Sequence, residues 1–197
     1  MNLFRSPLLL VPILCLVAAG CGRKPSPVVT QQPPGQVMPT PFLSPGVRNP
    51  PVQPAKAAHL ADDLPVVGVV VDKRARAYTL RALSKVRWHI VNDVLDKTPV
   101  TVVYCDTFDC LRVYTGAADG EPLPLSQVGR STDGLMVSYQ GQTYAQSTGK
   151  RLYTEGPDLP LTALPHERTT WKRWREAHPE TEVYDGPEAP APEAEGK

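Results

Sequence analysis

Residues 66–80 read VVGVVVDKRARAYTL, and this stretch decides the fold class. The apolar, β-branched run at 66–71 is typical of a strand, and apolar residues alternate with others again over 75–80. Asp72, Lys73 and Arg74, between the two runs, are polar residues of the kind found in turns. The stretch therefore predicts a β-hairpin.

Strand periodicity continues on the C-terminal side of this hairpin. Further strands are predicted at residues 89–95, 99–104, 111–115, 135–139, 143–146 and 183–184. The segments between them are rich in Gly, Asp and other polar residues, which favour turns. Short turns between successive strands predict a mainly antiparallel arrangement.

One segment has the period of a helix instead. In residues 169–178 the apolar side chains of Trp171, Trp174 and Ala177 recur every three positions, and Pro179 terminates the segment. Thr170 precedes the first of them and is a residue type favoured at helix N-caps. Two indoles on one helix face are expected to pack against a sheet. We therefore predict an α+β, β-rich fold, with one compact domain over residues 60–185 and its C-terminal helix packed on the sheet.

The N-terminus has the pattern of an export signal. Arg5 precedes an apolar run of about a dozen residues, shorter than the roughly 20 needed to span a bilayer. The run ends in small residues directly before Cys21, an arrangement that resembles the lipobox of bacterial lipoproteins. This pattern predicts a lipoprotein signal peptide over residues 1–20 and lipidation of Cys21. Because residue 22 is Gly rather than Asp, the outer membrane is the expected location where the cell has one.

Two segments of the chain are rich in proline. Residues 21–59 carry prolines interleaved with polar residues, and residues 186–197 combine prolines with glutamates. Proline removes a backbone donor and fixes φ, so such segments favour extended spacers over helices or sheets. We expect a disordered tether at 21–59 and a disordered acidic tail at 186–197. The whole chain has a formal net charge of +1 and no basic stripe, so nucleic acid is not an expected partner.

Several motifs also resemble a known family. They are VGVVVD at 67–72, ARAYTL at 75–80, HIVND at 89–93, PVTVVYC at 99–105, TTW at 169–171 and HPET at 178–181. Their order and spacing are similar to those of the bacterial family of unknown function designated DUF3179. Members of that family commonly carry a second cysteine three positions after the first. Here the two cysteines, Cys105 and Cys110, lie five positions apart.

Cys105 and Cys110 are the first candidates for a functional site, because Cys15 belongs to the predicted signal and Cys21 to the lipid anchor. Four states are compatible with the pair: a structural disulfide, a redox-active pair, two separate thiols, or metal ligands together with His89 and one further ligand. A disulfide requires residues 106–109 to turn back sharply, since five residues of straight strand span about 17 Å.

His89 and Asp93 are the other candidates. Strand alternation predicts that His89, Val91 and Asp93 share one face, so that Asp93 could orient the imidazole ring. The sequence leaves two roles open for His89: a hydrogen-bonded structural side chain, or a general base or ligand. Signatures of phosphate-binding loops and of common hydrolases are absent from the sequence.

These observations predict a lipid-anchored protein of the bacterial envelope that acts as a binding or interaction module. The alternative is a thiol-redox or metal-assisted enzyme using Cys105, Cys110 and His89. No cofactor is expected, apart from a metal ion in that alternative. The expected partners are membrane lipid through Cys21 and an envelope protein or small ligand whose identity the sequence leaves open.

Overall fold

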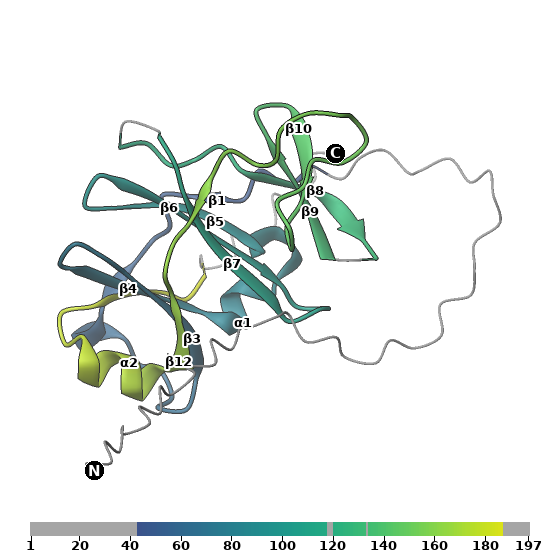
Figure 1. Ribbon diagram of the computed structural model, residues 1–197. Coiled ribbons are helices and arrows are strands. Elements are labelled where there is room, and N and C mark those ends of the chain that lie inside the picture. The colour runs from purple at the N-terminus through teal and green to yellow at the C-terminus, as the bar shows by residue number, and fades with distance from the viewer. Residues whose placement is uncertain (1–42, 118–119, 133, 187–197) are drawn as a thin grey trace, which may run out of the picture.

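A computed structural model describes residues 43–117, 120–132 and 134–186. The predicted signal peptide, Cys21 and most of both proline-rich segments lie outside these ranges. The described chain is rich in strands, mainly antiparallel, and forms three sheets with two short α-helices (Figure 1). Within this part of the chain, no helix has the length and apolar character needed to cross a bilayer.

The hairpin predicted at residues 66–80 lies in the first sheet. It consists of β3 (Pro65–Val71) and β4 (Arg74–Thr79), with Val66 opposite Thr79. The sheet has the order β12-β3-β4-β13-β2, where β12 is Glu167–Thr170, β13 is Glu182–Tyr184 and β2 is Gln53–Pro54. Strand β13 pairs in parallel with β4 and antiparallel with β2.

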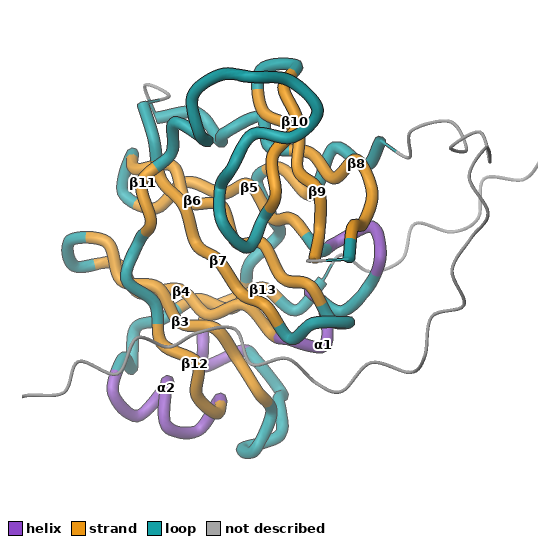
Figure 2. Tube along the Cα trace, turned by 45° about the vertical axis from the view of Figure 1, so that its right-hand side comes forward, coloured by secondary structure: helices purple, strands orange, loops and turns teal. Residues whose placement is uncertain are grey.

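The second sheet lies at the centre of the molecule. Its order is β1-β5-β6-β7-β11, with β1 at Val47–Arg48, β5 at Ile90–Leu95, β6 at Thr98–Cys105, β7 at Cys110–Thr115 and β11 at Thr162–Ala163. The third sheet has the order β10-β9-β8, with β8 at Ser126–Ser131, β9 at Gly134–Tyr139 and β10 at Gln142–Ala145. Figure 2 shows the β8–β10 strands at the far end of the molecule from α2.

Two apolar clusters lie between these three sheets. One lies between the first and second sheets and includes Tyr78, Val91 and Val102. Another lies between the second and third sheets and includes Ile90, Val103 and Val137. Because the central sheet is covered on both faces, β6 is buried along nearly its whole length, which explains its continuous apolar sequence.

The predicted C-terminal helix is confirmed as α2 (Trp171–Ala177), and it packs on the outer face of the first sheet. Trp171 and Trp174 are both buried, and Gly68 in β3 lies directly beneath the Trp174 ring. A side chain at residue 68 would collide with this ring. Thr170 is the N-cap residue, although its side chain makes no capping hydrogen bond.

The ordered domain begins before residue 60, the predicted boundary. Residues 44–59, assigned above to a disordered tether, contribute β1, β2 and a short 3-10 helix at Ala55–Ala57. Proline is compatible with edge strands, because their outward backbone groups need no partner in the sheet. The positive φ of Gly46 also allows the chain to approach Ile90 closely before β1 pairs with β5.

The segment between β4 and β5 differs from its prediction. Thr79 caps α1 (Leu80–Leu83), with its hydroxyl accepting a hydrogen bond from the Ala82 amide. A 3-10 helix follows at Val86–Trp88, and His89 closes it with φ −58° and ψ −20°. His89 therefore precedes strand β5 instead of beginning it.

Candidate functional site

The two cysteines face each other at the end of a hairpin. Strand β6 ends at Cys105, β7 begins at Cys110, and the two residues are direct partners in the antiparallel register. Residues 106–109 thus make the sharp turn that a bridge between the cysteines would require. The structure holds both residues as buried free thiols in the cluster between the second and third sheets, without the disulfide that was one of the four states left open by the sequence.

Two ion pairs connect the loop between the cysteines to neighbouring strands. Asp106 accepts a hydrogen bond from Arg130 of β8 at 2.8 Å, and Asp109 accepts one from Arg168 of β12 at 2.7 Å. The hydroxyl of Tyr104 also donates to Asp109 at 2.9 Å. Burial, followed by the hydrogen bond and charge of Asp109, raises the pKa of Tyr104 to about 12. The loop therefore contacts both outer sheets.

His89 is fully buried, and both of its ring nitrogens have partners. Nδ1 lies 2.7 Å from the carbonyl oxygen of Leu83, and Nε2 lies 2.7 Å from Nη2 of Arg130. A carbonyl only accepts and a guanidinium only donates, so these partners assign the proton to Nδ1. Burial lowers the pKa of His89 and the charge of Arg130 lowers it further, against the opposing effects of the Leu83 carbonyl and Asp106. These contacts describe a neutral imidazole whose Nε2 lone pair is occupied.

Asp93 contacts the first sheet, whereas His89 contacts Arg130 of the third sheet, so the prediction that Asp93 orients His89 is wrong. Both of its carboxylate oxygens accept hydrogen bonds from Nη1 of Arg76, at 2.7 and 2.6 Å, and Tyr78 donates to one of them at 2.7 Å. Nη2 of Arg76 donates to Glu182 at 2.6 Å. Burial favours a neutral Arg76, but the contacts with Asp93 and Glu182 outweigh this effect and raise its pKa. Asp93 therefore belongs to an ion network that joins the first and second sheets.

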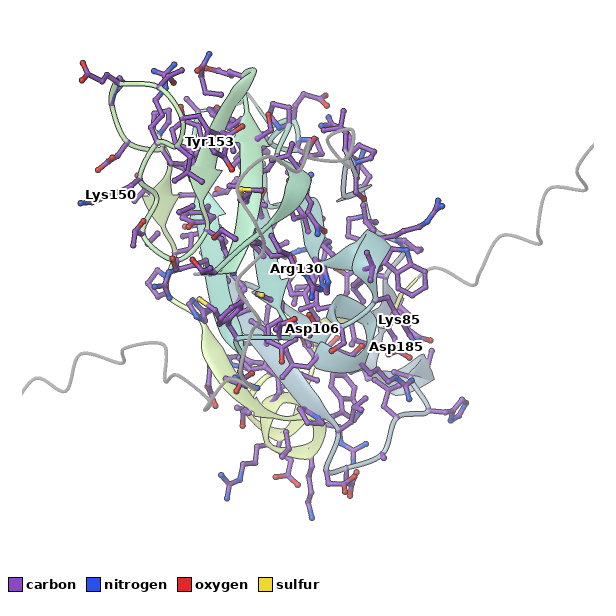
Figure 3. All side chains as sticks on the ribbon, turned by 90° about the vertical axis from the view of Figure 1, so that its right-hand side faces the viewer. Lys85, Asp106, Arg130, Lys150, Tyr153 and Asp185 are labelled. Atoms are coloured by element: carbon purple, nitrogen blue, oxygen red, sulfur yellow. The ribbon has the colours of Figure 1, made fainter. Side chains whose placement is uncertain are left out.

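The structure brings His89 close to the cysteine hairpin through Arg130. Nε2 of His89 lies 3.6 Å from Oδ1 of Asp106, the residue that follows Cys105. Figure 3 labels Arg130 and Asp106, which form an ion pair, on the same side of the molecule as Lys85 and Asp185. Sequence reasoning missed Arg130, because strand β8 is broken by a register shift between Gln127 and Gly129 and has no clear alternation. No motif in the sequence singled out this arginine.

Metal ligands do not gather in the described residues. Within these ranges, no group of three or more His, Cys, Asp or Glu side chains is placed to hold an ion. A surface cavity of about 570 Å³ lies beside α2 and is lined by Lys73, Arg74, His178 and Glu180, among others. None of the four residues predicted as site candidates lines this cavity.

Comparison with known proteins agrees with the resemblance seen in the sequence motifs. No curated protein and no solved structure matches the chain. The family described as "Protein of unknown function (DUF3179)" matches residues 44–191, a range that includes β1 and β2 as well as the domain predicted from the sequence. The chain therefore belongs to the DUF3179 family.

Proposed function

We propose that this protein is a lipid-anchored component of the bacterial envelope whose folded domain acts as a binding or interaction module. The anchor is Cys21, and the proline-rich residues before Leu43 connect it to the domain. The observation that carries the binding role is the burial of the candidate reactive residues. His89, Asp93, Cys105 and Cys110 are at most 3% exposed.

Their contacts agree with this role. The Nε2 atom of His89 accepts a hydrogen bond from Arg130, so it can accept a substrate proton only after Arg130 moves. Asp93 forms an ion pair with Arg76, and the thiols lie inside an apolar cluster. By contrast, Arg130 and Asp106 are each about one-third exposed, at 35% and 37% of the side chain. Surface recognition by charged residues on a rigid sheet scaffold fits this arrangement better than chemistry at a buried side chain does.

The anchor is tested by metabolic labelling with a fatty acid. We expect the wild-type chain to incorporate the label and to remain with the membrane fraction, and the Cys21→Ser chain to do neither. Label that persists in the Cys21→Ser chain would contradict the assignment of the lipidation site.

The binding role is tested by chemical crosslinking in intact cells. We expect discrete adducts that persist when Cys105 and Cys110 are both replaced by Ser and that weaken in Arg130→Glu. Lys172→Glu, an exposed cation on α2, is the matched control and should leave the adducts unchanged. Adducts that disappear in the double cysteine variant, with the fold intact by circular dichroism, would contradict a purely binding role.

The register of the β6–β7 hairpin favours a thiol-redox role as the second candidate. Directly opposed residues of antiparallel strands have Cα atoms about 4.5–5.5 Å apart, a separation that suits a disulfide. In this role Cys105 and Cys110 would pass two electrons and two protons to a partner disulfide. The partner would become a dithiol and the pair a cystine. Both thiols are buried, so exchange would require the 106–109 loop to open.

A further inference from the structure

The segment that joins α1 to β5 carries positive charge and exposed apolar surface together. We call residues 81–88 the α1–β5 patch. The patch contains Arg81, Lys85 and Arg87 and no acidic residue. Lys85 and Arg87 are exposed, and Val86 between them is 53% exposed, one of few large apolar side chains with that exposure among the described residues.

The charges of the patch are only partly balanced by neighbouring residues. Arg81 forms an ion pair with Asp185, which leaves Lys85 and Arg87 without an ion pair among the described residues. The exposed cations of α2, Lys172 and Arg173, differ in having acidic residues close by. They border a hollow that also contains the acidic side chains of Asp62, Asp63 and Glu176.

Trp88 completes the patch. Of the three tryptophans in the chain, Trp171 and Trp174 are buried, whereas Trp88 is only partly buried. One part of its ring packs on the apolar cluster between the first two sheets, next to Gly186. Partly exposed indoles flanked by cations are common where proteins meet the interface of a bilayer.

The patch also lies beside the point where the tether joins the domain. Strand β1 runs parallel to β5, with Val47 opposite Val91, and the preceding Gly46 packs against Ile90, two residues after Trp88. Leu43, where the described chain begins, is 65% exposed. Ser44 pairs with Gln127 of β8. The chain that leads back to Cys21 therefore enters the domain between β8 and the start of β5, which follows Trp88 in the sequence.

We propose that the α1–β5 patch binds the surface of a membrane that contains anionic lipid. Lys85 and Arg87 attract the headgroups, while Val86 and Trp88 reach the boundary with the acyl chains. This inference rests on the proposed anchor at Cys21. Tethering raises the effective concentration of the patch at the bilayer and so strengthens the binding that the patch provides by itself. The face that carries Lys85 in Figure 3 is then turned toward the lipid.

The test uses the chain from residue 21 onward with Cys21→Ser, so that no acyl chain contributes to binding. This protein is mixed with vesicles of phosphatidylcholine alone or with phosphatidylglycerol added, and binding is measured by co-sedimentation. We expect binding only to the anionic vesicles and its loss in high salt. Replacing Lys85 and Arg87 by Gln should weaken binding about 25-fold, since each cation near the surface contributes about fivefold. Replacing Lys172 and Arg173 by Gln is the matched control and should have little effect.

Tryptophan fluorescence gives a second measurement on the same samples. Because the other two indoles are buried, a vesicle-induced shift of emission to shorter wavelength reports on Trp88. We expect the shift with anionic vesicles and its absence in Trp88→Phe. A shift that persists in Trp88→Phe would contradict contact through this side chain.

Three further outcomes would overturn the proposal. One is equal binding by the Lys85/Arg87 and Lys172/Arg173 double variants, and another is the absence of binding to either vesicle. The third is binding that appears only after removal of residues 187–197, since the patch would then not bind lipid in the whole chain. Failure of the anchor is a separate result: the Cys21→Ser chain would still bind anionic vesicles, but the wild-type chain would incorporate no fatty acid.

Discussion

The environment of His89 favours one protonation state of the ring. A protonated imidazole would direct an Nε2–H group at the Arg130 guanidinium, which can only donate hydrogen bonds. The imidazole is therefore a structural acceptor that holds Arg130 at the surface, and Arg130 in turn holds the loop after Cys105. The His89 side chain thus acts on the surface through Arg130.

The lowered pKa of His89 predicts how stability depends on pH. The unfolded chain binds the proton more readily than the folded chain, so the free energy of unfolding should fall as pH decreases below about 6.5. In His89→Asn, which can still donate to Leu83 but does not titrate, this fall should be smaller. The measurement is the urea midpoint at pH 7.5 and pH 5.5.

His166→Asn is the control for that experiment, because His166 is exposed. It should show the same pH dependence as the wild-type chain. The hydrogen bonds of Asp185 with Arg81 and Thr79 outweigh the effect of burial and lower its pKa from 3.8. The stability contributed by Asp185 is present above that pH and is lost only at lower pH, so it does not interfere. Equal pH dependence of His89→Asn and the wild-type chain would contradict the neutral buried imidazole.

At Gly68 the structure leaves no room for a side chain. A Cβ atom at this position would lie 2.1 Å from Cζ3 of Trp174. We expect Gly68→Ala to lower the free energy of unfolding by about 1–3 kcal/mol, the usual cost of overpacking. The double variant Gly68→Ala/Trp174→Leu should lose less stability than the sum of the two single losses, because both substitutions act on one contact. Additive losses in urea titrations would contradict this explanation.

At the scale of elements, the β6–β7 hairpin combines a buried thiol pair with a loop held from two sides. The ion pair of Asp106 reaches the third sheet, and that of Asp109 reaches the first. Because the thiols belong to an apolar cluster, a reagent reaches them only when the hairpin opens.

The hairpin predicts the reactivity of the two thiols. In the chain from residue 21 with Cys21→Ser, unfolding without reductant should release two reactive thiols, and the folded protein should react far more slowly. The Cys105→Ser variant should release one reactive thiol on unfolding. A count of zero that rises to two on reduction would contradict the thiol state and favour the redox candidate. The measurement is a colorimetric thiol assay with and without urea.

At the scale of the whole molecule, arginines connect the layers. Arg76 joins the first and second sheets, and Arg130 joins the third sheet to the central hairpin. Removing one partner of a buried ion pair leaves an uncompensated charge, which costs about 3–5 kcal/mol. Arg76→Met should therefore destabilise the protein strongly in urea titrations.

Lys56→Met provides the comparison for Arg76→Met. The Lys56–Glu180 pair is 79% and 85% exposed, and exposed pairs contribute at most about 1 kcal/mol. We expect Lys56→Met to change the free energy of unfolding only slightly. If Arg76→Met lost as little stability as Lys56→Met, the ion network between the sheets would contribute little to stability.

Strong local patterns account for the elements that sequence analysis identified. The 66–80 hairpin and the helix at Trp171 have clear periods and polar ends, and both are confirmed. The strands that were missed are β1, β2, β8, β11 and β12. Strands β1, β2, β11 and β12 are short and pair with distant parts of the chain, so local periodicity does not reveal them. Their conformations depend on a neighbouring strand. Strand β8 has a register shift that interrupts its alternation.

By itself, the sequence determined the strand-rich class, the position of the C-terminal helix and membership of the family. These features follow from hydrophobic period and motif order, which are properties of neighbouring residues. The tertiary structure alone decided that His89 contacts Arg130 and that Asp93 contacts Arg76. The reason is physical: a one-residue difference in where β5 begins moves His89 away from the face that carries Asp93, and only the packing of three sheets determines which charges meet.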